Sequence, residues 1–273
     1  MSHLVFESDM PKICVPIVGQ TEMDIVKAGE ELKNSIVDLI EWRGDFFSGI
    51  TDGEQLKKIL LQLRKVLGNK PLLFTLRTAF EGGEISLSFD EYADILKSAA
   101  KTGCIDYIDV EIFWGYREKN RNSDYYDLDK INFPKEIAED SCHSPVRNLL
   151  QELQPKVEVI GSYHDFAKTP SVEEITSRLC VMKHLGASIP KIAVMPQTKK
   201  DVLNLMAATL QAKEALPDTP MISMSMGALG AVSRVAGANF GSAVTFGCYG
   251  KASAPGQIPI EQLHSILENL TIG

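Results

Sequence analysis

The 273-residue chain has few cysteines, and none of them has the spacing of a metal or disulfide site. The five are scattered and never form a CxxC pair: Cys14, Cys104, Cys142, Cys180 and Cys248. Such a pattern indicates free thiols in a reducing compartment. No histidine lies in an HExxH or similar spacing, so we expect no metal site.

Long apolar runs and basic clusters are also missing. No apolar stretch approaches the roughly 20 residues that a membrane helix needs. The N-terminal MSHLVFESDMPK lacks the basic-then-apolar order of a signal peptide. The formal net charge is −8, and no stripe of Lys and Arg stands out. We therefore expect a cytoplasmic protein that has neither nucleic acid nor a membrane as a partner.

The chain does contain eight short apolar runs that alternate with helix-like segments. The runs cover residues 13–18, 36–42, 72–77, 107–112, 157–163, 189–195, 221–226 and 242–246. Unbroken β-then-α alternation predicts a parallel sheet, and the count predicts an α/β fold of the (β/α)8 TIM-barrel type, formed by residues 1–273 as one domain. A doubly wound open sheet is the alternative, but no GxGxxG follows the first run. Residues 3–10 resemble a short edge segment, and polar residues between about 114 and 144 indicate an insertion after strand four.

Local signals predict where several helices begin and end. Capping boxes at residues 51–54, 88–91 and 171–174 place helix starts at Thr51, Ser88 and Ser171. Gly68, Gly103 and Gly186 follow the last periodic residues, as C-terminal caps do. Residues 199–215 and 260–270 also have helical patterns.

Charged or polar residues recur near the carboxyl ends of the predicted strands, where barrel enzymes have their active sites. Alternation along each strand places these residues on a common face: Glu41 with Arg43, Thr75 with Arg77, Asp109 with Glu111, and Ser162 with His164. Each could be a structural ion pair, such as Glu41 with Arg43 or Arg77. Their recurrence on successive buried strands favours a ligand site.

Lys191 is the most informative of these residues because it lies inside the apolar run 189–196. A buried ammonium loses its hydration, so it needs a partner or gives up its proton, and a neutral lysine can form a Schiff base. The alternative is a lysine at the strand edge that extends to water. His164 is a candidate acid/base, or alternatively a surface or capping histidine.

Three loop features complete the candidate site. Glu81 precedes the glycine-rich turn 82–84, where it could face the barrel mouth or solvent. Arg234 stands beside a small-residue region. Residues 251–257 form a loop of small residues that can close over a ligand, although a surface turn has a similar composition.

Several motifs together resemble the type I 3-dehydroquinate dehydratase (3-dehydroquinase) family. The resemblance rests on residues 41–43, 72–77, 81–84, 164–170, 190–197, 224–226, 233–234 and 253–257, in this order along nearly the whole chain. It implies a (β/α)8 barrel, a homodimer without a cofactor, and dehydration of the small-molecule substrate 3-dehydroquinate to 3-dehydroshikimate through an imine.

By this resemblance, Lys191 is the Schiff-base lysine, His164 transfers the proton, and Glu81 orients His164. The implied substrate contacts are Glu41, Arg43, Arg77, Arg234, Ser253 and Gln257. The insertion near residues 114–144 is longer than the family leads us to expect. Two alternatives stay open: a class I aldolase-type barrel that acts on a sugar phosphate, and a non-catalytic barrel that binds a shikimate-type acid.

Overall fold

The computed structural model describes residues 4, 6, 10–114, 144–250 and 254–270. Eight parallel strands form its centre, and all eight overlap the predicted runs. Their bounds are β1 Lys12–Ile17, β2 Leu39–Arg43, β3 Leu72–Thr75, β4 Tyr107–Glu111, β5 Glu158–Asp165, β6 Ile189–Val194, β7 Ile222–Ser225 and β8 Val244–Cys248. A two-residue strand, β9 (Ile258–Pro259), pairs with the end of β8.

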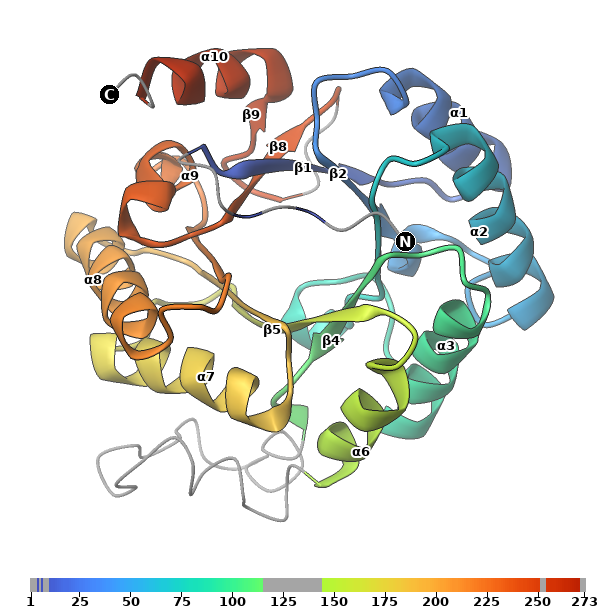
Figure 1. The fold of residues 1–273 in the computed structure, drawn as a ribbon, viewed down its shortest axis with the longest axis horizontal. Helices are drawn as coiled ribbons and strands as arrows, with labels where there is room; N and C mark the ends of the chain where they lie inside the picture. The colour runs from blue at the N-terminus through green and yellow to red at the C-terminus, as the bar shows by residue number, and fades with distance from the viewer. Residues whose placement is uncertain (1–3, 5, 7–9, 115–143, 251–253, 271–273) are drawn as a thin grey trace.

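The strands curl into a ring, which Figure 1 shows in end view. β1 pairs in parallel with both β2 and β8, and each strand from β2 to β6 pairs with the next. The ring closes between β7 and β8 at a single parallel bridge, Met221 to Ser242. There the amide of Ala243 donates a 2.7 Å hydrogen bond to the carbonyl of Met221. The predicted (β/α)8 barrel is confirmed.

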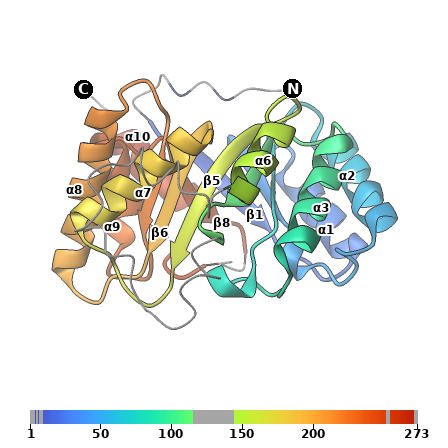
Figure 2. The ribbon, with the colours of Figure 1, turned by 90° about the horizontal axis from the view of Figure 1, so that it is seen from below.

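Helices surround the strands, and Figure 2 shows them on the outside of the barrel. Their bounds are α1 Glu22–Leu32, α2 Gly53–Leu67, α3 Phe89–Lys101, α6 Ser144–Leu153, α7 Val172–Leu185, α8 Lys199–Ala215, α9 Ala231–Ala236 and α10 Ile260–Leu270. Within the described residues, no helix has both the length and the apolar character needed to cross a bilayer. The predicted insertion falls on residues 115–143, outside the described part of the chain.

The helix starts follow their capping residues, with one correction. Ser88 and Glu91 form the predicted reciprocal capping box, and Ser171 caps α7. The predicted cap at Thr51 is wrong, because Asp52 is the N-cap of α2 and accepts hydrogen bonds from the two backbone amides at 54 and 55. An aspartate carboxylate satisfies the free amides of a first helical turn as well as a hydroxyl does, so it competes with a neighbouring threonine.

The apolar core has two parts. The larger part lies between the strands and the helices, and the smaller fills the inside of the barrel with residues such as Leu39, Leu73 and Tyr107. Leu4 and Phe6, from the predicted edge segment, pack against this inner cluster. The amide of Leu4 donates a 2.8 Å hydrogen bond to the hydroxyl of Tyr107. The inner cluster therefore leaves polar side chains room only toward the carboxyl ends of the strands.

Candidate active site

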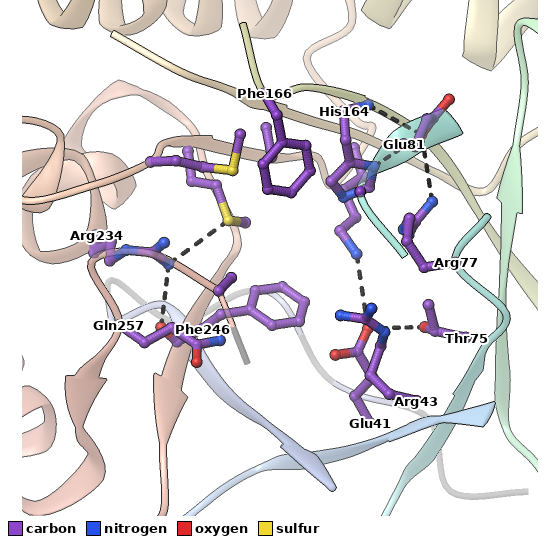
Figure 3. Close-up of a pocket in the computed structure, with 16 residues that line it drawn as sticks. Glu41, Arg43, Thr75, Arg77, Glu81, His164, Phe166, Arg234, Phe246 and Gln257 are labelled. Atoms are coloured by element: carbon purple, nitrogen blue, oxygen red, sulfur yellow. Dashed lines mark hydrogen bonds and ion pairs between the residues drawn. The ribbon is translucent and has the colours of Figure 1, made fainter. Parts of the chain in front are cut away.

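A pocket opens at the carboxyl ends of the barrel strands. It is lined by Glu41, Arg43, Thr75, Arg77, Glu81, Gly82, His164, Phe166, Lys191, Ala193, Met224, Met226, Arg234, Phe246, Ala254 and Gln257. Figure 3 shows Arg234 and Gln257 on one side of this pocket and Arg43 on the other. Every predicted site residue among the described ones lies here, and the predicted strand faces are those observed. Ser253 lies outside the described residues.

Lys191 extends from β6 into the barrel and is only 3% exposed. Its Nζ lies 3.0 Å from Oδ2 of Asp109 and 3.9 Å from Oε1 of Glu41. The ring of Phe246 covers it, with the ring centroid 4.7 Å from Nζ. The ammonium therefore has a buried carboxylate partner, and the alternative of a lysine extending to water from the strand edge is wrong.

His164 lies at the end of β5 against Glu81. Its Nδ1 is 2.9 Å from Oε2 of Glu81, and its backbone amide donates to the same oxygen at 3.0 Å. Because an ionised carboxylate only accepts, Nδ1 carries the proton and Nε2 keeps its lone pair for the pocket. Burial, followed by the positive charges of Arg77 and Lys191, lowers the pKa of His164 well below its ordinary value of 6.5. The imidazole is therefore neutral at pH 7.

Glu81 reaches this position through a short 3-10 turn, η2 (Ala79–Glu81), that follows β3. The turn ends at Gly82, whose φ of +81° is in the left-handed region. A Cβ at Gly82 would lie 2.6 Å from Cζ of the partly exposed Phe166 ring, which would have to shift, so the left-handed backbone is the stronger reason for glycine here. The turn buries Glu81 completely and points its carboxylate at His164.

Arg77 occupies the centre of a carboxylate cluster. Its guanidinium lies 2.8 Å from Asp109, 3.0 Å from Glu111 and 3.4 Å from Glu81. It also donates to the hydroxyl of Ser162 at 3.1 Å. Burial opposes the charge of Arg77, but the three carboxylates outweigh it and raise the pKa of the guanidinium. The predicted substrate contact of Arg77 must therefore share a guanidinium that already bonds to the protein.

Two residues to which the sequence prediction gave no site role, Asp45 and Thr75, hold the polar side of the pocket in place. Asp45 accepts bonds of 2.8 and 2.7 Å from Arg43, a bidentate pair, and also accepts from the amide of Arg77 at 3.3 Å. Thr75 donates to Glu41 at 2.8 Å. Of the two, only Thr75 could be placed at the pocket from the sequence, because strand alternation puts it on the same face as Arg77. Asp45 follows the strand in a 3-10 turn, where alternation no longer predicts direction.

Arg234 is a buried guanidinium on the opposite side. It donates to the carbonyls of Phe246 at 3.3 Å and Pro255 at 3.0 Å, while its buried Nε has no hydrogen-bond partner. No carboxylate of the described residues pairs with it. Burial lowers the pKa of Arg234 to about 10. A buried cation without a counter-ion fits a ligand that carries a negative charge.

The carboxylates of the described residues are not arranged as the ligands of a metal ion. No cluster of three or more His, Cys, Asp or Glu residues there has an arrangement that could hold a metal ion. The carboxylates of the pocket bond instead to lysine, arginine, histidine and hydroxyl groups. The chemistry of the site is therefore derived from these side chains.

Fold and site together define a class of protein. A closed parallel barrel with a buried lysine, histidine and carboxylates at the carboxyl ends of its strands is a (β/α)8-barrel enzyme. The family model for type I 3-dehydroquinase matches residues 13–273. The chain belongs to the type I 3-dehydroquinase family.

Known relatives match along nearly their whole length. The 3-dehydroquinate dehydratase of Clostridioides difficile (strain 630) is 44% identical over 270 residues, which is 99% of this chain and 96% of the relative. That of Salmonella typhimurium (strain LT2) is 42% identical over 264 residues, or 97% of this chain and 94% of the relative. A solved type I 3-dehydroquinate dehydratase from Clostridium difficile, with covalent modified comenic acid, has a TM-score of 0.84 at 42% identity, covering 99% of this chain and 96% of its own.

Proposed function

We propose that this lyase dehydrates 3-dehydroquinate to 3-dehydroshikimate through an imine on Lys191, as a step in the biosynthesis of aromatic amino acids. The observation that carries the proposal is the buried pair of Lys191 with Asp109, in one pocket with a neutral His164 held by Glu81. Family membership supports the same reaction. The covalent modified comenic acid in the Clostridium difficile structure is consistent with a reactive site in that relative.

The first step converts the ketone of the substrate into an imine that can accept electrons. The neutral amine of Lys191 attacks the ketone carbon and a carbon–nitrogen bond forms. The ketone oxygen then leaves as water with one proton from the amine nitrogen and one proton taken up from solvent. The product is a protonated imine, whose nitrogen accepts electrons far better than the ketone oxygen does. The covering ring of Phe246 and the burial of Lys191 limit access of bulk water at this stage.

The second step is the elimination. Nε2 of His164 takes the proton from the carbon next to the imine, and the C–H electron pair moves toward the nitrogen to form an enamine. The enamine then expels the β-hydroxyl group, which leaves as water with the proton carried by His164. Hydrolysis of the resulting conjugated imine frees the enone and restores the amine of Lys191. Glu81 keeps His164 in the tautomer that can accept this proton.

Substrate orientation falls to the polar residues on the two sides of the pocket. Arg234 and Gln257, with Ser253, bind the substrate carboxylate, because Arg234 is a buried cation that has no carboxylate partner among the described residues. Glu41, Arg43 and Arg77 bind the ring hydroxyls from the other side. A bidentate or paired arginine is a precise orienting group, and positioning of this kind lowers the entropic part of the barrier.

The test combines an ultraviolet assay with trapping of the intermediate. The purified chain with 3-dehydroquinate should generate the absorbance of a conjugated enone. Borohydride added during turnover should leave one covalent adduct on Lys191, seen by peptide mass spectrometry. Lys191→Ala should lose both signals while keeping some ligand affinity. An adduct on Lys168 or Lys183, or none, contradicts the assignment.

The same experiment separates the alternatives. An aldolase-type barrel would give an adduct with a sugar phosphate and no enone, and a binding protein would retain 3-dehydroquinate unchanged. As parts of the proposal, the protein needs no cofactor, is cytoplasmic and is a homodimer. The resemblance of the sequence to the family supports these points. Sedimentation equilibrium measures the subunit number, and a monomer at micromolar concentration contradicts the last of them.

A further inference from the structure

Asp109 is a buried carboxylate beside Lys191 to which the sequence prediction gave no catalytic role. It lies on β4 and is 1% exposed. Its Oδ2 accepts the 3.0 Å hydrogen bond from Nζ of Lys191. Its Oδ1 accepts from the hydroxyl of Ser162 at 2.6 Å and lies 2.8 Å from the guanidinium of Arg77. Two contacts on one oxygen therefore hold the carboxylate in one orientation and leave the other oxygen to Lys191.

The other titratable groups near Lys191 are weaker partners. They face it from neighbouring strands and are Cys14 of β1, Glu41 of β2 and His164 of β5. Burial raises the pKa of the Cys14 thiol, so it carries no charge near neutral pH. Oε1 of Glu41 is 3.9 Å from Nζ and already accepts from Thr75. Asp109 is thus the nearest anion and makes the hydrogen bond to Nζ.

We propose that Asp109 is the counter-ion of the lysine nitrogen throughout the reaction, first of the ammonium and then of the protonated imine. The inference rests on the proposed function and adds a positioning residue to it. The imine nitrogen occupies nearly the place of Nζ, because the new bond forms at that atom. A carboxylate locked 3.0 Å away therefore faces a positive charge in both states.

Such a counter-ion has opposite effects on the two halves of the reaction. Attack on the ketone needs the neutral amine, and Asp109 favours the ammonium, so it slows the first step at low pH. Elimination needs the protonated imine, because only its positive nitrogen receives the electron pair of the broken C–H bond. Asp109 favours that form and so promotes the second step. No new reactant is needed, since the carboxylate itself stays ionised.

Asp109 remains ionised because two cations surround it. Burial disfavours the charged carboxylate, but Arg77 and Lys191 outweigh burial and hold the pKa of Asp109 well below its ordinary value. Arg77 lies 2.8 Å from Oδ1, the oxygen that does not contact Nζ, so attachment of a substrate carbon to Lys191 does not compete for this contact. A general-acid role for Asp109 is therefore disfavoured, and a fixed negative charge is its function.

Asp109→Asn tests the inference because it keeps the shape and removes the charge. In rapid-quench experiments, enzyme and 3-dehydroquinate are mixed at pH 5–9, stopped with alkaline borohydride, and the adduct is counted by intact mass. We expect the pH profile of imine formation to move about 1–3 units lower, the range typical of losing an opposite charge at this distance. Enone release from the preformed imine should slow about tenfold or more at pH 8.

Ser162→Ala is the matched control, since it removes a hydrogen bond to Asp109 and keeps the charge. The pH profile of imine formation in Ser162→Ala should stay within about half a unit of the wild-type profile. If Asp109 had only a structural role, both variants would be disturbed to the same extent. An unshifted Asp109→Asn profile, or equal slowing of both steps, overturns the inference. If Asp109→Asn does not fold, Asp109→Glu is the deciding variant, because it keeps the negative charge. A shift of a full pH unit in its profile of imine formation would then overturn the inference. Failure of the proposed function would appear separately, as wild type without adduct or enone.

Discussion

At the scale of the residue, the site is a continuous chain of contacts in which four alternating charges lead to a neutral imidazole. Lys191 contacts Asp109, Asp109 contacts Arg77, Arg77 contacts Glu81, and Glu81 contacts His164. All of these residues are buried or nearly so, and all except Asp109 line the pocket. Because neighbours in such a network share partners, substitutions within it will not be additive in stability or rate.

His164 makes the stability of the protein depend on pH. Its pKa is lowered well below 6.5 in the folded protein, so below that pH the unfolded chain binds a proton that the native state excludes. The free energy of unfolding therefore falls as pH drops from about 6.5, by up to about 1.4 kcal/mol per pH unit for one group. His164→Gln should remove this slope, which urea unfolding between pH 5 and 7.5 measures. Parallel curves for the two proteins would rule the explanation out.

At the scale of the element, most strands could be predicted from the sequence and several helices could not. Strands β1 to β8 are short runs rich in apolar, buried residues, which is a strong local signal, although only some of them are rich in β-branched residues. α1 starts at Glu22 after its N-cap, Thr21, but few apolar residues mark its buried face. α6 starts at Ser144, where the polar insertion hides the start.

The candidate site also has one part that could be predicted from the sequence and one part that could not. Alternation placed Glu41, Arg43, Arg77, His164 and Lys191 correctly, because all lie on strands or directly after them. Alternation does not show which charge pairs with which. The carboxylate on Arg43 proved to be Asp45 rather than Glu41, since pairing depends on the turn after β2. The direction of Asp45 is set by this turn, which strand alternation does not predict.

The segment from Ala254 to Gln257 docks over the pocket through backbone contacts. The amide of Gly227 donates to the carbonyl of Pro255 at 3.1 Å, and Arg234 donates to the same carbonyl at 3.0 Å. Gly256 has a φ of +78°. A Cβ at Gly256 would lie 2.7 Å from the carbonyl carbon of Gly227, so the two backbones can meet only because no side chain intervenes.

Gly256→Ala should therefore weaken docking of this segment over the ligand. Backbone strain and the clash together cost a few kcal/mol, and we expect kcat/KM to fall at least about tenfold. Gly250→Ala is the control: Gly250 has a φ of +69°, but an added Cβ there meets nothing within 4 Å. Steady-state kinetics of the two variants measure the difference. Equal losses would mean that strain alone, and not the backbone contact, determines activity.

At the scale of the whole molecule, the candidate active site and a stabilising ion pair lie at opposite ends of the barrel. At the amino ends of the strands, Arg64 of α2 lies 2.5 Å from Asp106 and donates to the carbonyls of Cys104, Gly68 and Lys70 at 2.8, 2.8 and 3.0 Å. Asp106 also accepts from the amide of Leu72 at 3.0 Å. One arginine thus joins α2 to the starts of β3 and β4.

Arg64→Ala should destabilise the protein without changing its chemistry. Removing one partner of this partly buried pair takes the cation from Asp106, which keeps the amide of Leu72, and the side-chain donor from three carbonyls, for a loss of roughly 2–4 kcal/mol. We propose that the chain unfolds as one domain, so calorimetry should show one transition at a lower Tm, with kcat/KM unchanged. Arg64→Lys, which keeps the charge but not the fork of donors, should lie in between. A variant with wild-type Tm would contradict the role of this contact.

The bridge between Met221 and Ser242 has a consequence for association between chains. A sheet that does not close presents unpaired amides and carbonyls along two edges, which can pair with strands of other molecules. Here one backbone bridge joins β7 to β8, and the Ser242 hydroxyl accepts from the amide of Ser223 at 3.1 Å. The Ser242 hydroxyl therefore helps to keep the ring of eight strands closed, so that β7 and β8 do not become exposed edge strands. The single bridge between these two strands thus also opposes aggregation.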